Sequence, residues 1–128
     1  MLRTMMRAKV HGATLIVATL NYVGSLTLDA AIMDRLDMLP NEQVQVLNMN
    51  NGSRLMTYLI PGERNSGVVA LNGAAARLGQ PGDKVLIVTY GAMDEDEARR
   101  FQPKVALVDE NNRISEVLEG ASAVSGRL

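Results

Sequence analysis

The stretch Leu39-Pro40-Asn41-Glu42-Gln43-Val44-Gln45-Val46 decides the fold, because a second stretch repeats its pattern. Gln80-Pro81-Gly82-Asp83-Lys84-Val85-Leu86-Ile87 has the same order of a turn, an acidic residue, one variable residue and an apolar strand. Two such units in a small β-rich chain are typical of a barrel with a pseudo-two-fold axis. We therefore expect a mainly β fold, a closed six-stranded barrel with short capping helices, which leaves no exposed strand edge.

The elements expected around these units follow from hydrophobic periodicity and turn residues. Asp29 and Asn72 are placed to cap two of the helices. Gly12-Ala13 is expected to form a turn between the first two strands, and Asn50-Asn51-Gly52 a hairpin turn. Strands are expected over residues 3–11, 14–17, 24–28, 42–48, 54–60, 67–71, 84–90 and 105–108, and short helices over residues 30–36, 73–78 and 94–100.

Length and charge limit the class of protein. The 128 residues fit one domain, residues 1–128, whose Gly/Ala/Ser-rich end, residues 120–128, is expected to fray. A formal charge of −1 argues against strong binding to nucleic acid or an anionic membrane. The apolar run over residues 14–20 is too short to span a bilayer, and residues 1–7 do not form a secretory signal. A cytoplasmic protein is therefore expected.

The absence of cysteine and the single histidine limit the chemistry. Without cysteine there are no disulfides, thiolate metal ligands or cysteine nucleophiles, and His11 alone excludes a multi-histidine metal site within one chain. No metal is expected. An enzyme built from this sequence uses Ser, Thr, Tyr, Lys, Arg or carboxylates, or carries a cofactor that is not visible as a standard residue.

Several short motifs occur in a fixed order along the chain. They are Lys9-Val10-His11, Tyr22-Val23-Gly24-Ser25, Asn51-Gly52-Ser53-Arg54-Leu55-Met56-Thr57-Tyr58, Glu63-Arg64-Asn65-Ser66-Gly67, Asn72-Gly73-Ala74-Ala75-Ala76, Gly82-Asp83 and Glu97-Ala98-Arg99. With this order and spacing, the chain resembles the pyruvoyl-dependent aspartate decarboxylases. One motif would be a weak signal, whereas the ordered set is specific.

The resemblance implies a double-psi β-barrel that assembles as a homotetramer, with active sites between neighbouring subunits. It also implies decarboxylation of L-aspartate to β-alanine and CO2, for pantothenate biosynthesis. Some relatives need a helper protein for maturation, which makes such a protein a candidate partner.

Ser25 is, by this resemblance, the precursor of a covalent pyruvoyl group. Its hydroxyl attacks the carbonyl of Gly24, and cleavage leaves residues 1–24 and a second chain, residues 25–128, that begins with the pyruvoyl group. Thr57 is the candidate donor to the oxygen of the attacked carbonyl. The pyruvoyl ketone forms a Schiff base with the amine of aspartate, and Tyr58 then donates the proton that replaces the lost carboxylate.

The resemblance also assigns residues to substrate binding. Arg54 can hold a carboxylate through two parallel hydrogen bonds, and Lys9 is the candidate for the other carboxylate. The start of the helix at residues 73–78 is rich in donors, which come from Asn72 and the backbone amides of Gly73, Ala74 and Ala75.

His11 and Tyr22 flank the site in the family and are expected to shape it.

Two other interpretations of the function stay open. A non-catalytic double-psi barrel that binds or regulates a partner would keep the apolar strands and the Gly82-Asp83 turn, but would not need Ser25 with Arg54 and Tyr58. A serine hydrolase built on Ser25 and His11 lacks a nucleophile elbow and a third partner. A chain split after Gly24 would favour the decarboxylase.

Overall fold

The protein is described by a computed structural model that covers residues 1–19 and 25–120. Tyr22, Gly24 and the end of the chain after residue 120 lie outside the described residues. The strands are β1 (Arg3–Thr14), β2 (Val17–Thr19), β3 (Ser25–Asp29), β4 (Gln43–Asn48), β5 (Arg54–Gly62), β6 (Val69–Asn72), β7 (Lys84–Met93), β8 (Lys104–Val108) and β9 (Ile114–Glu119). The helices are α1 (Ala30–Arg35), the 3₁₀-helix η1 (Gly73–Leu78) and α2 (Glu95–Arg100).

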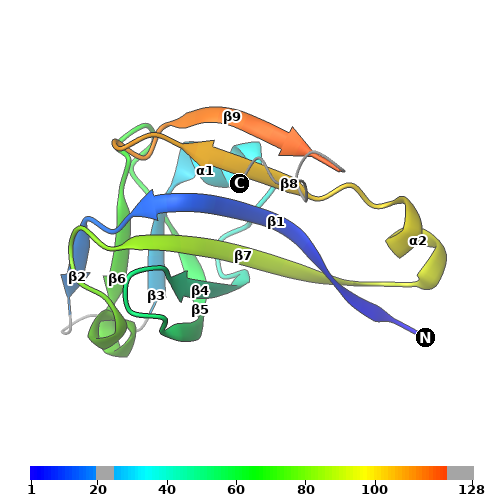
Figure 1. Cartoon of the computed structure of the whole chain (residues 1–128), viewed down its shortest axis with the longest axis horizontal. Coiled ribbons are helices and arrows are strands. Elements are labelled where there is room, and N and C mark those ends of the chain that lie inside the picture. The colour runs from blue at the N-terminus through cyan, green and yellow to red at the C-terminus, as the bar shows by residue number, and fades with distance from the viewer. Residues whose placement is uncertain (20–24, 121–128) are drawn as a thin grey trace.

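The strands form one sheet in the order β2-β6-β3-β5-β4-β7-β1-β8-β9. In Figure 1 the long strands β1 and β7 run side by side, α2 joins the far end of β7 to β8, and the β8–β9 hairpin lies beyond β1. A mainly β fold with short helices is therefore confirmed. The hydrogen-bonded order ends at β2 and β9, so closure into a barrel stays a prediction. No helix among the described residues is long and apolar enough to cross a membrane.

The predicted turn at Gly12-Ala13 is wrong, because β1 continues through it to Thr14. Gly12 has a φ of 75°, and the pairing of β1 with β7 shifts register between His11 and Ala13. An extra residue inside an antiparallel pair is a β-bulge, which bends a strand without ending it. The glycine therefore kinks β1, and the next strand begins only at Val17.

Strand β9 is absent from the sequence-based prediction, although it pairs with β8 from Ile114 to Glu119, with one register shift at Ser115. The turn before it is held by the carboxylate of Asp109, which accepts hydrogen bonds from the backbone amides of Asn111 and Arg113. Strand β9 lies at the edge of the sheet and exposes Ser115 and Glu116 together. Adjacent exposed residues hide the alternation by which a strand is recognised.

Two carboxylates repeat the same contacts in the two halves of the chain. Glu42 accepts a hydrogen bond from the backbone amide of Leu39, and Asp83 accepts one from the backbone amide of Gln80. Glu42 also accepts a side-chain hydrogen bond from Thr89. Asp83 likewise accepts one from Asn48, at 2.8 Å. These turns are the two units of the sequence repeat, which is therefore a structural repeat.

The strands that follow these turns pair with each other. β4 and β7 are antiparallel, and Val46 lies opposite Ile87. The sequence repeat aligns these same two residues, so a pseudo-two-fold axis passes close to their pair. Both side chains are buried in the hydrophobic core.

The helix α1 begins where the sequence predicted. The Asp29 side chain accepts a hydrogen bond from the backbone amide of Ala31, which makes it the N-cap. Ile32, Met33 and Leu36 are buried and cover one end of the core. Helix α2 begins one residue later than predicted, because Asp94 is its N-cap and accepts a hydrogen bond from the backbone amide of Glu97.

Candidate active site

Ser25 is the first residue of β3, and it lies directly opposite Asn72 of β6. Ser25 is completely buried. Asn72 Nδ2 donates hydrogen bonds to Ser25 Oγ at 3.0 Å and to Thr27 Oγ1 at 2.9 Å. The prediction that the Asn72 side chain caps the following helix is wrong, because η1 has no side-chain cap and the amide is used across the sheet instead.

Thr27 was missed by the sequence-based reasoning, although one signal pointed to it. Residues two apart in a strand share a face, so Thr27 lies on the same face as Ser25. Asn72 bonds to both hydroxyl groups and fixes their positions relative to β6.

Tyr58 lies on the other side of Ser25. β3 and β5 are parallel, and Leu26 is paired with Leu59. Ser25 and Tyr58 each come one residue before this first pair of the two strands, so the register, continued by one residue, puts them next to each other. Tyr58 is half-buried. Three predicted residues, Asn72, Ser25 and Tyr58, are thus brought together on adjacent strands.

Thr57 lines a cavity of about 280 Å³ between β5 and η1. Ala74 and Ala75 of η1 form the facing wall. Gly73 precedes them with a φ of 63°, which glycine adopts at little cost. The cavity is lined by Leu55, Met56, Thr57, Ala74, Ala75 and Leu78.

Arg54 begins β5 and is exposed. The alternation of the strand places Arg54 on the same face as Tyr58. Within the described residues, the ion pairs formed by arginine involve Arg3, Arg7, Arg64 and Arg99, so Arg54 has no carboxylate partner there. Its guanidinium is available to an anionic ligand.

Lys9 and His11 lie on β1, which pairs with β7 and β8. These strands are separate from β5 and β6, which flank Ser25. Among the described residues, no strand pairing joins Lys9 or His11 to Ser25, and a hydrolase dyad of Ser25 with His11 gains no support.

His11 has an unusual environment. Its Nδ1 is buried and has no hydrogen-bond partner among the described residues. Burial, followed by the positive charge of Lys9, lowers the pKa of His11. The imidazole is therefore biased towards its neutral form, in which one ring nitrogen can accept a hydrogen bond.

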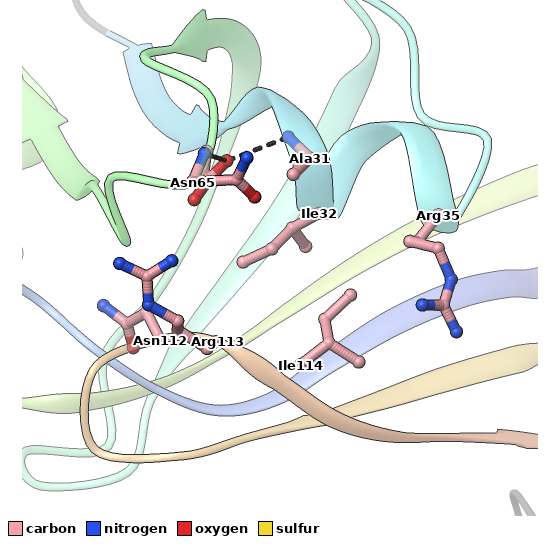
Figure 2. Close-up of a pocket in the computed structure, with 8 residues that line it drawn as sticks. Ala31, Ile32, Arg35, Asn65, Asn112, Arg113 and Ile114 are labelled. Atoms are coloured by element: carbon pink, nitrogen blue, oxygen red, sulfur yellow. Dashed lines mark hydrogen bonds between the residues drawn. The ribbon is translucent and has the colours of Figure 1, made fainter.

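A second cavity, also of about 280 Å³, lies between α1 and the start of β9. Figure 2 shows Arg35 and Arg113 on either side of Ile32 and Ile114. The carboxylate of Asp29 at this cavity is already occupied, since it accepts hydrogen bonds from the backbone amides of Ala31, Asn65 and Gly67.

These contacts decide the charge of Asp29. Burial raises the pKa of Asp29, but the three backbone hydrogen bonds and the nearby charge of Arg113 outweigh it and lower the pKa. The cavity in Figure 2 is thus built around a carboxylate that ties α1 to the loop after β5. Asp29 therefore serves the fold.

Metal ligands are not clustered in the part of the chain that the structure describes. No group of three or more His, Asp or Glu side chains lies close enough there to hold an ion. Tyr22 and Gly24, which complete the predicted site, lie outside the described residues.

Comparison with known proteins places the chain in a family. The sequence profile described as "Aspartate decarboxylase" matches residues 1–115. The chain is 58% identical over 123 residues to the aspartate 1-decarboxylase of Bacillus cereus strain G9842, covering 96% of this chain and 97% of that protein. It is 56% identical over 123 residues to the aspartate 1-decarboxylase of Bacillus thuringiensis strain Al Hakam, with the same coverage. The chain therefore belongs to the aspartate decarboxylase family.

Proposed function

We propose that this protein is a self-processing aspartate 1-decarboxylase that converts L-aspartate to β-alanine and CO2, for pantothenate biosynthesis. Family membership over residues 1–115 supports the reaction. The observation that carries the proposal is that Ser25 is buried and hydrogen-bonded to Asn72 on the adjacent strand β6.

Self-processing begins at Ser25. Its hydroxyl oxygen attacks the carbonyl carbon of Gly24, and the peptide bond is replaced by an ester. β-Elimination then breaks the bond between Oγ and Cβ of residue 25, which releases residues 1–24 with a carboxyl end. Water hydrolyses the dehydroalanine left at residue 25, and ammonia leaves as the pyruvoyl group forms. The hydrogen bond from Asn72 to Ser25 Oγ orients the hydroxyl for the first step.

The residues around position 25 fit a pyruvoyl group. Asn72 Nδ2 lies 3.0 Å from Ser25 Oγ, an atom that leaves with Gly24 on cleavage. The ketone oxygen of a pyruvoyl group would replace the nitrogen of residue 25, and an amide N–H beside this residue can donate to a carbonyl oxygen. The pyruvoyl group supplies a ketone that condenses with the substrate amine and accepts the electron pair released with CO2.

The cavity beside Thr57 is the proposed place for the substrate. The amides of Gly73, Ala74 and Ala75 at the start of η1 can donate to an anionic group, and Thr57 lines the facing wall. Arg54 at the start of β5 supplies positive charge for a carboxylate. L-Aspartate has two carboxylates, so a second cation is needed, and this is the proposed role of Lys9.

Tyr58 is the proposed proton donor. The register of β3 with β5, continued by one residue, puts it next to Ser25, and its phenolic O–H can donate a proton. A weak acid suffices where the acceptor is a strongly basic carbon.

A homotetramer would complete this site. One chain keeps Lys9 and His11 on β1, apart from the strands that carry Ser25, so a neighbouring subunit is the proposed source of Lys9, with His11 and Tyr22 shaping the site. Apolar side chains on the outside of one chain support assembly, because Met56, Ile60, Ile16 and Val17 are 36–53% exposed. We also place the enzyme in the cytoplasm, with a maturation helper as a candidate partner.

The proposed fold is the closed six-stranded double-psi barrel. Only Leu15 and Ile16 separate β1, which pairs with β7, from β2, which pairs with β6. Read as one strand, β1 and β2 would close the barrel. β5 changes partner in the same way, since Arg54–Tyr58 pair with β4 and Leu59–Gly62 with β3. This equivalence supports the pseudo-two-fold barrel.

The test combines intact mass and trapping. Purified protein is expected to give two fragments split after Gly24, and the fragment that begins at residue 25 should gain the mass of L-aspartate-derived amine after borohydride reduction. Ser25→Ala should remain one uncleaved chain and form no β-alanine. An uncleaved wild-type chain that still releases CO2 from aspartate would overturn the proposal.

A further inference from the structure

The backbone carbonyl of Leu78, the last residue of η1, is held by three side chains. It accepts hydrogen bonds from Asn48 Nδ2 at 3.2 Å, Asn51 Nδ2 at 3.1 Å and Ser53 Oγ at 2.9 Å. A carbonyl oxygen has two lone pairs, so two donors already satisfy it. The third donor is not needed to satisfy the oxygen. Its effect is to restrain the position of the Leu78 carbonyl.

The donors themselves are fixed by the turn between β4 and β5. Asn48 Oδ1 accepts hydrogen bonds from the backbone amides of Asn50 and Asn51. Asn51 Oδ1 accepts one from the backbone amide of Ser53. The turn is therefore rigid before it reaches η1, and Asn51 and Ser53 present their donors from a fixed position.

The chain after Leu78 is closely packed, which makes the position of η1 sensitive to this contact. A Cβ at Gly79 would lie 2.9 Å from Leu15 Cδ2 and 3.3 Å from Asn48 Nδ2. η1 has six residues, and about three residues make one turn of a 3₁₀-helix. A shift at Leu78 therefore passes through only two turns to Gly73.

The hydrogen bonds to the Leu78 carbonyl connect the two elements that form the walls of the cavity, β5 and η1. Ser53 immediately precedes Arg54, the first residue of β5, and β5 supplies Thr57 to one wall. Leu78 ends η1, which supplies Ala74 and Ala75 to the other wall. The hydrogen bond from Ser53 to Leu78 thus links the two elements that form the walls of the proposed substrate cavity.

We propose that Ser53 and Asn51 are positioning residues of the decarboxylase, which set the width of the substrate cavity through the Leu78 carbonyl. This inference rests on the proposed function. Neither side chain contacts the reacting atoms. Their contribution is to hold the amides of η1 where a carboxylate of the substrate can reach them together with Arg54.

The effect on binding should be separable from an effect on stability. Ser53→Ala leaves Asn48 and Asn51 on the carbonyl, so no buried acceptor loses all its partners and the cost in folding is small. The wall formed by η1 loses one restraint, and a small misplacement of a binding group costs much more in catalysis than in stability.

The experiment compares Ser53→Ala with Ser53→Thr and with Ser115→Ala. Ser115 Oγ also donates to a backbone carbonyl, that of Leu107 at 3.1 Å, but it lies on β9 away from the cavity. The kcat and the KM for L-aspartate are measured per processed subunit, counted by intact mass, and Tm is measured for each variant. Ser53→Ala should raise KM by about fivefold to tenfold, because the η1 wall proposed to hold the substrate carboxylate loses one of its restraints.

Ser53→Thr should restore KM, because it returns the hydroxyl, and Ser115→Ala should match wild type in KM. Tm should fall equally in Ser53→Ala and Ser115→Ala. Asn51→Asp, which keeps the acceptor for Ser53 but replaces the donor to Leu78, provides a second route to the same rise in KM.

A wild-type KM in Ser53→Ala and in Asn51→Asp would overturn the inference, as would a failure of Ser53→Thr to restore KM. In those cases an active, cleaved wild-type enzyme would still support the proposed function. An inactive wild-type protein that remains uncleaved would instead overturn the proposed function.

Discussion

Arg7 Nη2 lies 2.6 Å from Glu42 Oε2, and each side chain is 21% exposed. The same carboxylate accepts hydrogen bonds from the hydroxyl of Thr89 and the backbone amide of Leu39. Arg7 is on β1 and Thr89 on β7, so Glu42 ties the turn before β4 to both strands. This turn belongs to the first unit of the sequence repeat, from which the barrel was predicted.

The contacts of Glu42 make stability depend on pH. Burial raises the pKa of Glu42, but hydrogen bonds from Thr89, Arg7 and the amide of Leu39, with the charge of Arg7, outweigh it and lower the pKa. A lowered pKa stabilises the folded state fully above the unfolded pKa of about 4.3, and this stability is lost as the pH falls through the folded pKa.

Glu42→Gln should therefore lower the free energy of unfolding at pH 7 by about 1–3 kcal/mol. Thermal unfolding of both proteins between pH 3 and pH 7 measures the difference. The gap in Tm should shrink as the pH falls below about 4.3, because the wild-type carboxylate then becomes protonated. A gap that stays constant over this range would contradict the ionised role of Glu42.

Asn72→Ala should lower kcat/KM for L-aspartate by at least about tenfold, since it removes the amide that donates to residue 25 and to Thr27. The control is Thr27→Val, which keeps Asn72 and its contact with residue 25. This control should lose much less activity. Rates are compared per processed subunit, with cleavage followed on a denaturing gel. Equal losses of kcat/KM in the two variants would show that the contact of Asn72 with residue 25 contributes no more to activity than its contact with Thr27.

Some features of the fold were predicted correctly from the sequence. Asp29 caps its helix as predicted, because a cap is decided by neighbours in the chain. The repeat at Val46 and Ile87 also proved structural, since both strands follow similar turns. These features depend on local pattern, which a single sequence records.

The features that the sequence did not predict depend on pairing between strands far apart in the chain. Asn72 looks like a helix cap in the sequence, and only the antiparallel register of β3 and β6 turns its amide to Ser25. Gly12 looks like a turn, but the long pairing of β1 with β7 absorbs it as a bulge. The neighbourhood of Ser25 and Tyr58 follows from a parallel pair that no spacing in the sequence reveals.

Tyr58→Phe should leave cleavage after Gly24 largely intact and reduce β-alanine formation by about 100-fold or more, because it removes the proposed proton donor. Tyr90→Phe is a matched control, since Tyr90 Oη donates to Gln45 Oε1 at 2.8 Å on the exposed surface. Product formation is measured by chromatography. Normal turnover in Tyr58→Phe, or an equal loss in Tyr90→Phe, would remove Tyr58 from its role.

Gly67→Ala tests the loop that joins β5 to the strand carrying Asn72. Gly67 has a φ of 73°, and a Cβ there would lie 2.3 Å from the backbone oxygen of Asn111. Because that oxygen belongs to the backbone, the clash cannot be relieved by a side-chain rotation. The amide of Gly67 also donates to Asp29 Oδ2 at 2.9 Å, so a shift of this residue would loosen the start of α1.

Gly52→Ala is the matched control, since Gly52 has a φ of 76° but nothing within 4 Å of the added Cβ. The control should cost about 1 kcal/mol for its positive φ alone. Gly67→Ala should cost clearly more, at least about 3 kcal/mol, because steric overlap adds to the same backbone strain. Denaturant unfolding of the two variants measures both values. Equal destabilisation would mean that the contact between Gly67 and Asn111 yields easily, and that the β8–β9 turn is not fixed against this loop.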